Sequence, residues 1–280
     1  MSIAVKNLEN VTIDEVKEFN GTRYEVSDSY LQTDRHINQS DRYHTIQPAS
    51  VGSVLAEHNF KLISLLTGRA KHEDKRSFQR TISRYRSEDA FEIDGVSLDI
   101  IYIGKHLGRG CDELILGFFR GTCANQWNAG TNFEVVKIRH TANAVDGIRE
   151  GIAALLEQRA KLIETIKKMQ ATTLSLGQIT ELAEKFAEIR LAEVKNLVSF
   201  DSKELATVRR EEDKGNDLFT IMNVLQENAV RTRLSYQVNS TDKNGNPRVR
   251  YMSTRLVRES SVKMVELNAQ FFNEALKLVA

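Results

Sequence analysis

The sequence has few cysteines, no long apolar run and no N-terminal targeting signal, and each shortage excludes a class of protein. Its 280 residues include two cysteines, Cys111 and Cys123, too few for a disulfide framework, which indicates a reducing compartment. No apolar run approaches the ~20 residues that a membrane-spanning helix needs. The N-terminus lacks the charged start and apolar core of a signal peptide. We therefore expect a cytoplasmic protein with no membrane partner.

A net charge close to zero and a shortage of proline further limit the classes of protein to which this chain can belong. Lysine and arginine total 39 against 38 acidic residues, so a nucleic-acid partner must be argued from local patches. With only Pro48 and Pro247, the chain has no proline-rich linker, and it shows neither a low-complexity tract nor an internal repeat. A hydrophobic content of 41% is typical of a globular protein with a substantial core.

The first half of the sequence predicts a polar arm, a short helix and an antiparallel sheet. Residues 1–45 are polar and rich in turn formers, and the next segment predicts a short helix capped by Ser50. From Phe60 to His140 the apolar period changes to two. The five predicted strands are FKLISLLTG (60–68), SFQRTISRYR (77–86), VSLDIIYIG (96–104), ELILGFFRGT (113–122) and FEVVKIRH (133–140). The gaps between them are too short for helical crossovers, which favours antiparallel pairing.

After His140 the apolar period becomes helical. Asn143 is placed to cap a long helix that ends near Gln170, and further helices are expected near 175–194, 216–230 and 260–279. We therefore predict an α+β fold, with an antiparallel sheet in the first half and helices, one of them long, in the second. The expected domains are a polar N-terminal arm (1–45), a sheet with a short and a long helix (46–171), and a helical region with a basic loop (172–280). Whether the helices cover the sheet or form their own lobe stays open.

The sequence contains residues that suggest a metal site, a thiol nucleophile and a phosphate-binding loop, but their spacing does not support these sites. All six histidines lie in the first 140 residues, but no His-x-x-x-His or Cys-x-x-Cys spacing supports a metal site. Cys123 with His140 suggests a thiol nucleophile and its base, although a cysteine is commonly a small buried apolar residue. Residues 104–110 (GKHLGRG) are similar to a phosphate-cradling loop, but a strand follows instead of a helix. We therefore predict no enzyme activity, no metal and no cofactor.

Two basic segments with interleaved aromatic residues give the stronger signal. Residues 69–86 hold seven Lys or Arg against two acids, and residues 231–263 hold eight against two. Lysine and arginine neutralise phosphates, and aromatic rings stack on unpaired bases. In the first segment, alternation along a strand places on one face Arg76, Phe78, Arg80, Ile82 and Arg84. The predicted contacts to phosphate are Arg76, Arg80, Arg84, Arg248 and Arg250, with Tyr85 and Tyr251 for base stacking. The alternative is that both segments are ordinary solvated surfaces.

The segment 116–141 combines an apolar strand, a Cys-Ala-Asn turn, the only tryptophan and a second strand that ends in Lys-Ile-Arg-His. Such a mixture of apolar and polar chemistry is typical of the centre of a binding surface. The residues expected to form or support this central surface are Arg120, Asn125, Trp127, Arg139 and His140.

Three motif segments lie in order over about residues 33–235. They are Asp34-Arg-His36 through Ser40-Asp-Arg-Tyr43; Gly117-Phe-Phe-Arg120 with Cys123-Ala-Asn125 and Arg139-His140; and Arg209-Arg-Glu-Glu-Asp-Lys-Gly-Asn-Asp-Leu218 with Gln226-Glu-Asn228. Together they resemble the phage- and plasmid-borne proteins of domain-of-unknown-function family 932. Gln126 departs from the glycine expected after the Cys-x-Asn turn. The resemblance implies a mobile-element protein in a bacterial host, and it supplies no catalytic residue.

We expect a phage or plasmid accessory protein that binds nucleic acid, with single-stranded DNA favoured, as a homo-oligomer. This expectation follows from the two basic segments with aromatic residues, and the expected role is protection or annealing in replication or recombination. A short sheet followed by a long helix is also similar in fold order to single-strand annealing proteins of the Rad52 type, which is an analogy of fold order and not a match of motifs. The alternative is a protein-binding accessory factor, such as an inhibitor of a host defence or replication enzyme. The choice of DNA or RNA and the identity of any host protein partner stay open.

Overall fold

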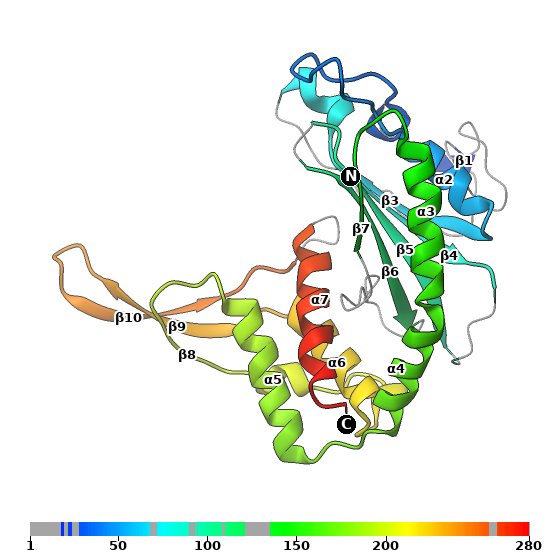
Figure 1. Ribbon diagram of the computed structural model, residues 1–280. Helices are drawn as coiled ribbons and strands as arrows, with labels where there is room; N and C mark the ends of the chain where they lie inside the picture. The colour runs from blue at the N-terminus through cyan, green and yellow to red at the C-terminus, as the bar shows by residue number, and fades with distance from the viewer. Residues whose placement is uncertain are drawn as a thin grey trace. The chain divides into compact units, whose positions relative to one another are not determined.

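The computed structural model describes residues 18–19, 22–23, 28–67, 72–89, 93, 95–107, 110–120, 135–257 and 262–279 (Figure 1). The chain divides into two units. Unit 1 comprises Met1–Phe119 and Phe133–Ala160, and unit 2 comprises Arg120–Asn132 and Lys161–Ala280. Strands dominate the first unit and helices the second, which confirms the predicted α+β class.

Unit 1 is built on an antiparallel sheet whose strands follow the order of the sequence. These strands are β3 (Phe60–Thr67), β4 (Thr81–Ser87), β5 (Val96–Gly104), β6 (Asp112–Arg120) and β7 (Val135–Ile138). Tyr85 of β4 lies opposite Ile100 of β5, and Asp112 of β6 lies opposite Ile138 of β7. The five predicted strands are thereby confirmed, although β4 begins four residues after the predicted start at Ser77.

Two helices approach the sheet at positions where only a glycine fits easily. A Cβ atom at Gly52 of α2 (Pro48–Ala56) would lie 3.1 Å from the Tyr85 hydroxyl. A Cβ atom at Gly151 of α3 (Ala144–Glu157) would lie only 2.7 Å from Cγ1 of Val136 on β7. Both helices therefore pack closely against the sheet.

The starts and ends of the helices show which capping predictions were right. Helix α2 begins at Pro48, whose fixed φ suits the first helical position, so the predicted cap at Ser50 is wrong. Asn143 precedes α3 as predicted, but its side chain makes no capping hydrogen bond. The predicted long helix is present as α3 and α4 (Arg159–Ala171), interrupted at Gln158. There the N–H of Gln158 donates to Leu155 O at 3.1 Å, an i→i−3 bond that tightens the last turn of α3.

Short elements complete unit 1. They are the two-residue strands β1 (Glu18–Phe19) and β2 (Thr22–Arg23), the single-turn helix α1 (Asp28–Leu31) and the 3₁₀-helix η2 (Glu73–Phe78). The Ser29 hydroxyl donates to Arg76 O and accepts from the Gln79 N–H, both at 2.9 Å. Helix α1, which lies within the predicted N-terminal arm, is thus bound to η2 and to the residue that ends it.

Unit 2 packs its helices around one that is almost entirely buried. Its elements are α4, α5 (Leu176–Leu191), α6 (Leu218–Arg231), α7 (Val262–Leu276), η3 (Lys203–Ala206) and η4 (Glu211–Asp213). Every residue of α6 from Leu218 to Val230 is buried. Ser175 and Gln178 form a capping box at the start of α5, and the Phe186 and Phe271 rings stack at 4.4 Å.

The predicted basic loop of the second half is a β-hairpin in a small antiparallel sheet. This sheet has the order β10-β9-β8, formed by β8 (Leu197–Phe200), β9 (Ser235–Thr241) and β10 (Pro247–Ser253). The tip of the hairpin is the turn at 244–247, where Gly245 has a φ of +84°. Within unit 2, the hairpin extends away from helices α5, α6 and α7 (Figure 1). In the part of the chain that the structure describes, no helix is long and apolar enough to cross a bilayer.

Candidate functional site

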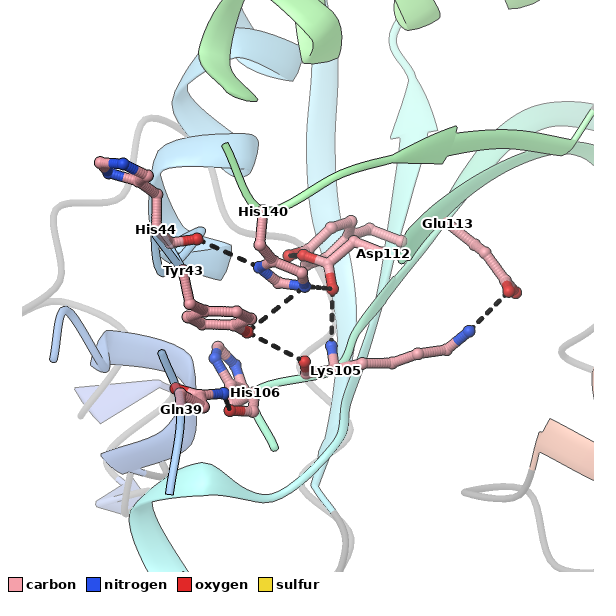
Figure 2. A network of polar contacts seen from close by, with 9 residues as sticks. Gln39, Tyr43, His44, Lys105, His106, Asp112, Glu113 and His140 are labelled. Carbon is pink, nitrogen blue, oxygen red and sulfur yellow. Dashed lines mark hydrogen bonds and ion pairs between the residues drawn. The ribbon is translucent and has the colours of Figure 1, made fainter. Parts of the chain in front are cut away.

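A buried carboxylate organises a polar cluster at the β5–β6 connection (Figure 2). The side chain of Asp112 is completely buried, accepts two hydrogen bonds and lies in contact with the His140 ring. Its Oδ2 accepts from the Tyr102 hydroxyl at 2.5 Å, and its Oδ1 accepts from the Lys105 backbone N–H at 2.7 Å. His140 Nε2 lies 3.1 Å from the same Oδ1. Burial, reinforced by the neighbouring Asp112 carboxylate, raises the pKa of Tyr102, so this phenol stays protonated.

His140 connects this carboxylate to the loop before α2. Its ring stacks on Tyr43 with centroids 4.4 Å apart, and its Nδ1 lies 3.2 Å from His44 O. The His44 N–H donates in return to His140 O at 3.2 Å, and the Tyr43 hydroxyl donates to Lys105 O at 3.3 Å. Burial raises the pKa of Tyr43, and the Asp112 charge adds to this effect. Two segments almost 100 residues apart in sequence are therefore held against the end of the sheet.

The Asp112 cluster has the composition of a catalytic site, but the polar atoms of Asp112 and of the His140 ring already have protein partners. Both oxygens of Asp112 accept bonds from the protein, and both ring nitrogens of His140 face protein oxygens. A general base needs a free nitrogen within reach of a substrate. We therefore interpret the cluster as a structural clamp. The clamp unites the first motif segment, through Tyr43, with the Arg139-His140 end of the second.

The third motif segment forms a second clamp, in unit 2. Arg210 donates to both carboxylate oxygens of the buried Glu227, at 2.6 and 2.9 Å, and to Asp213 at 3.1 Å. Asn228 donates to Leu205 O at 2.8 Å. As the charge at a helix N-terminus predicts, Asp217 caps α6, and its side chain accepts from the Thr220 N–H at 2.9 Å. This motif therefore fastens the 203–217 segment onto the central helix.

The first basic segment does not form the predicted surface. Arg76 lies in η2, and Arg80 precedes β4, so the predicted strand face 76–84 is wrong. Both side chains are exposed. Arg84 is only 3% exposed and Tyr85 only 1%, so neither side chain is available to a ligand. We correct the assignment of both as nucleic-acid contacts.

Arg84 is buried because a neighbouring strand supplies its counter-charge. Its guanidinium pairs with the buried Asp99 of β5, and Arg86 Nε donates to the same carboxylate at 3.0 Å. Burial lowers the pKa of Arg84, and the Asp99 charge opposes that effect. The charge that suggested a phosphate contact is therefore neutralised inside the sheet.

Residues 233–257 of the second basic segment are mostly exposed, and we call them the basic arm. Arg248, Arg250 and Tyr251 of β10 are all exposed, Tyr251 by 82%. Among the described residues, neither arginine has an ion-pair partner. Asp242 is the acid of the arm, and its carboxylate accepts hydrogen bonds from the turn, including the Asn246 N–H at 2.9 Å. These bonds, led by that of Asn246, lower the pKa of Asp242, so it stays ionised within the turn.

The predicted central surface is described only in part. Asn125 and Trp127 lie outside the described residues, as do Cys123 and the side chain of Arg120. Arg139 is exposed, whereas His140 belongs to the Asp112 clamp. Across the described ranges, no group of three or more His, Cys, Asp or Glu is placed to hold a metal ion.

Comparison with known proteins identifies relatives. The family model described as Domain of unknown function (DUF932) matches residues 35–266. The UPF0380 proteins YafZ and YfjQ of Escherichia coli (strain K12) are each 26% identical to the chain over 213 residues. The alignments cover 76% of this chain and 77% of either relative. No solved structure matches the chain.

Proposed function

We propose that this chain, which belongs to the DUF932 family, binds nucleic acid through its basic arm, with single-stranded DNA as the favoured ligand. The observation that supports the proposal is the exposure of Arg248, Arg250 and Tyr251 on one strand that extends from the helices of its unit. The proposed role is protection or annealing of single strands in the replication or recombination of a phage or plasmid.

The charge of the arm suits a polyanion. Its lysines and arginines are Arg233, Lys243, Arg248, Arg250 and Arg255, against the single acid Asp242. Because the whole chain carries a net charge of only +1, this positive charge is local. Phosphate contacts by such residues release counterions, which makes the binding strongly dependent on salt.

Tyr251 favours a single strand over a duplex. A ring that is 82% exposed has a free face on which an unpaired base can stack. In a duplex the bases are already stacked on one another, so that face gains less. A homo-oligomer would place several arms along one strand and increase the overall affinity by multivalency.

The test is the salt dependence of binding to a fluorescent single-stranded oligonucleotide, measured by anisotropy. The double variant Arg248→Ala/Arg250→Ala should lower the slope of log K against log salt by about 1.4, because each lost single-strand phosphate contact accounts for about 0.7. Tyr251→Ala should weaken binding by about 1–3 kcal/mol with the slope nearly unchanged.

The matched control removes two positive charges outside the arm. Lys161 and Lys203 are exposed lysines of unit 2, and Lys161→Ala/Lys203→Ala should bind like the wild type. The proposal fails if the wild-type protein does not bind the oligonucleotide at low salt. It also fails if the arm variant and the control variant have equal affinities and slopes.

A further inference from the structure

Strand β10 has one edge with no neighbouring strand in the described part of the chain, and the register of the sheet shows which of its backbone groups face that edge. The order of the small sheet is β10-β9-β8. On the β8 side of β9, the Asn239 N–H donates to Asn196 O at 2.9 Å, and Ser235 O accepts from the Asp201 N–H at 3.3 Å. Neighbouring residues of a strand direct their backbone groups to opposite sides. The odd-numbered residues of β9 therefore face β8, and the even-numbered residues face β10.

The pairing register of β9 with β10 gives the orientation of the backbone groups of β10. Val238 lies opposite Arg250, so Arg250, like Arg248, directs its N–H and C=O inward to β9. Beyond the strands the same parity holds, because the Thr254 N–H donates to Leu234 O at 3.0 Å. Val249 and Tyr251 therefore direct their backbone groups outward. Pro247 belongs to the same outward set, where its missing N–H breaks no bond to β9.

The free edge thus offers alternating donors and acceptors. Phosphates are acceptors only, so they match the N–H groups of Val249 and Tyr251 but not the C=O groups between them. An extended peptide matches both, as in recognition by strand addition. The opposite edge, β8, suits a further strand less well, because it has four residues and a register irregularity between Leu197 and Ser199.

The side chains of β10 specify the chemistry of the peptide. Arg248 and Arg250 lie on one face of the strand, and Val249 and Tyr251 lie on the other. Acidic residues at alternate positions of an added strand would face the two arginines, and apolar residues between them would face Val249 and Tyr251. A second copy of β10 would instead bring arginines close to arginines. We propose that β10 binds an extended segment of a partner protein in which acidic and apolar residues alternate. This inference does not depend on nucleic-acid binding.

The probe is a fluorescent, N-acetylated and C-amidated peptide of alternating Glu and Val, titrated with the full chain. Val249→Pro removes an outward N–H and leaves the β9–β10 bonds in place, so peptide affinity should fall about tenfold or more. Val249→Thr keeps that N–H and a β-branched side chain, and it should bind the peptide like the wild type. Arg248→Ala/Arg250→Ala should also weaken peptide binding.

Two further measurements separate strand addition from binding by charge alone. The urea denaturation midpoint of Val249→Pro should match that of Val249→Thr, which shows that the variant is folded. Where the wild type binds the oligonucleotide, Val249→Pro should bind it nearly as well, because the arginines and the Tyr251 side chain remain. A peptide N-methylated at alternate amides, on the side that would face β10, should not bind the unaltered protein. If the peptide does not bind, or if N-methylation and Val249→Pro have no effect, the inference is wrong. It is also wrong if the chain self-associates through β10 and takes up no peptide.

Discussion

Substitution of Asp112 tests whether the cluster at the end of the sheet is a structural clamp. The carboxylate is fully buried, accepts hydrogen bonds from Tyr102 and Lys105, and lies 3.1 Å from His140 Nε2. In Asp112→Ala these groups lose their partner at once, and the backbone N–H of Lys105 cannot rotate toward another acceptor, whereas His140 Nε2 keeps its contact with the Tyr43 hydroxyl at 3.4 Å. Asp112→Asn is milder, because an amide oxygen still accepts from Lys105 and His140, while its NH2 group donates to the rotatable Tyr102 hydroxyl.

The magnitude follows from the penalty for buried unsatisfied groups. Each orphaned donor costs about 1–3 kcal/mol, and loss of a buried hydrogen-bonding group that is charged costs more than loss of a neutral one. Because these effects overlap, we expect Asp112→Ala to lower the free energy of unfolding by about 3–5 kcal/mol. Asp112→Asn should lower it by about half as much, since only the charge is lost.

Urea denaturation followed by circular dichroism measures the difference. The matched control is Glu113→Ala, the next residue of β6, whose carboxylate is 22% exposed and pairs with Lys105 Nζ at 2.5 Å. That single, partly exposed pair should contribute about 1 kcal/mol or less. If the two alanine variants unfold at the same urea concentration, Asp112 is not the centre of a structural clamp. A normally stable Asp112→Ala protein that has lost a measurable activity would return the cluster to the catalytic hypothesis.

Three further substitutions probe other parts of the structure. Arg210→Met removes the cation that faces the buried Glu227 carboxylate and should lower the free energy of unfolding by about 2–3 kcal/mol, measured by urea denaturation; a neutral result would show that this ion pair is not stabilising. Asp217→Ala removes the bond to the Thr220 N–H and should lower it by about 1 kcal/mol, whereas Asp217→Asn should largely retain it. Burial lowers the pKa of His106, partly opposed by Asp112, so the unfolded state binds protons more readily and the wild type should lose stability as the pH falls below about 6.5. Thermal denaturation from about pH 7 to about pH 5 should show a smaller loss in His106→Leu, and equal losses would refute the assignment.

The predictable part of the fold is the part in which one face of an element is buried and the other exposed. Periodicity located all five strands of the large sheet and the helices of unit 2, and two of those helices begin with capping residues, Ser175 and Asp217. The cap at Ser50 failed because Pro48, two residues earlier, already fits the first helical position. The interruption between α3 and α4 was not predicted, because the sequence next to Gln158 contains neither Pro nor Gly.

The prediction that Arg84 and Tyr85 contact nucleic acid was wrong, and the sequence of β4 alone does not show why. Every residue from Thr81 to Tyr85 is buried, so both faces of the strand are covered. An arginine is tolerated there because the pairing of β4 with β5 brings it to Asp99. The pairing and register of two strands depend on the tertiary structure. Without that information, arginines at alternate positions of a strand are interpreted as an exposed face.

The basic composition of the arm is visible in the sequence, but its hairpin structure was not predicted. Its hairpin was expected as a loop because all seven residues of β10 are exposed, and a strand with two exposed faces shows no apolar alternation. Because Arg248, Arg250 and Tyr251 are exposed, the prediction that they contact nucleic acid is compatible with the structure. The clamps were missed as sites of contact because their partners, such as Tyr43 and His140, are far apart in the sequence.

The alternation of β10 leads to one further prediction, which connects both proposals. Arg250 and Tyr251 point to opposite faces, so a nucleic-acid strand that contacts both must cross the free edge of β10. A peptide added to that edge would occupy the crossing, and its acidic side chains would neutralise the arginines. The Glu-Val peptide should therefore displace a labelled oligonucleotide, with anisotropy falling to the value of the free strand. A scrambled peptide of the same composition controls for charge alone. A stable complex that contains protein, peptide and oligonucleotide together would show that the strand does not cross the edge, and that the two ligands use separate surfaces of the arm.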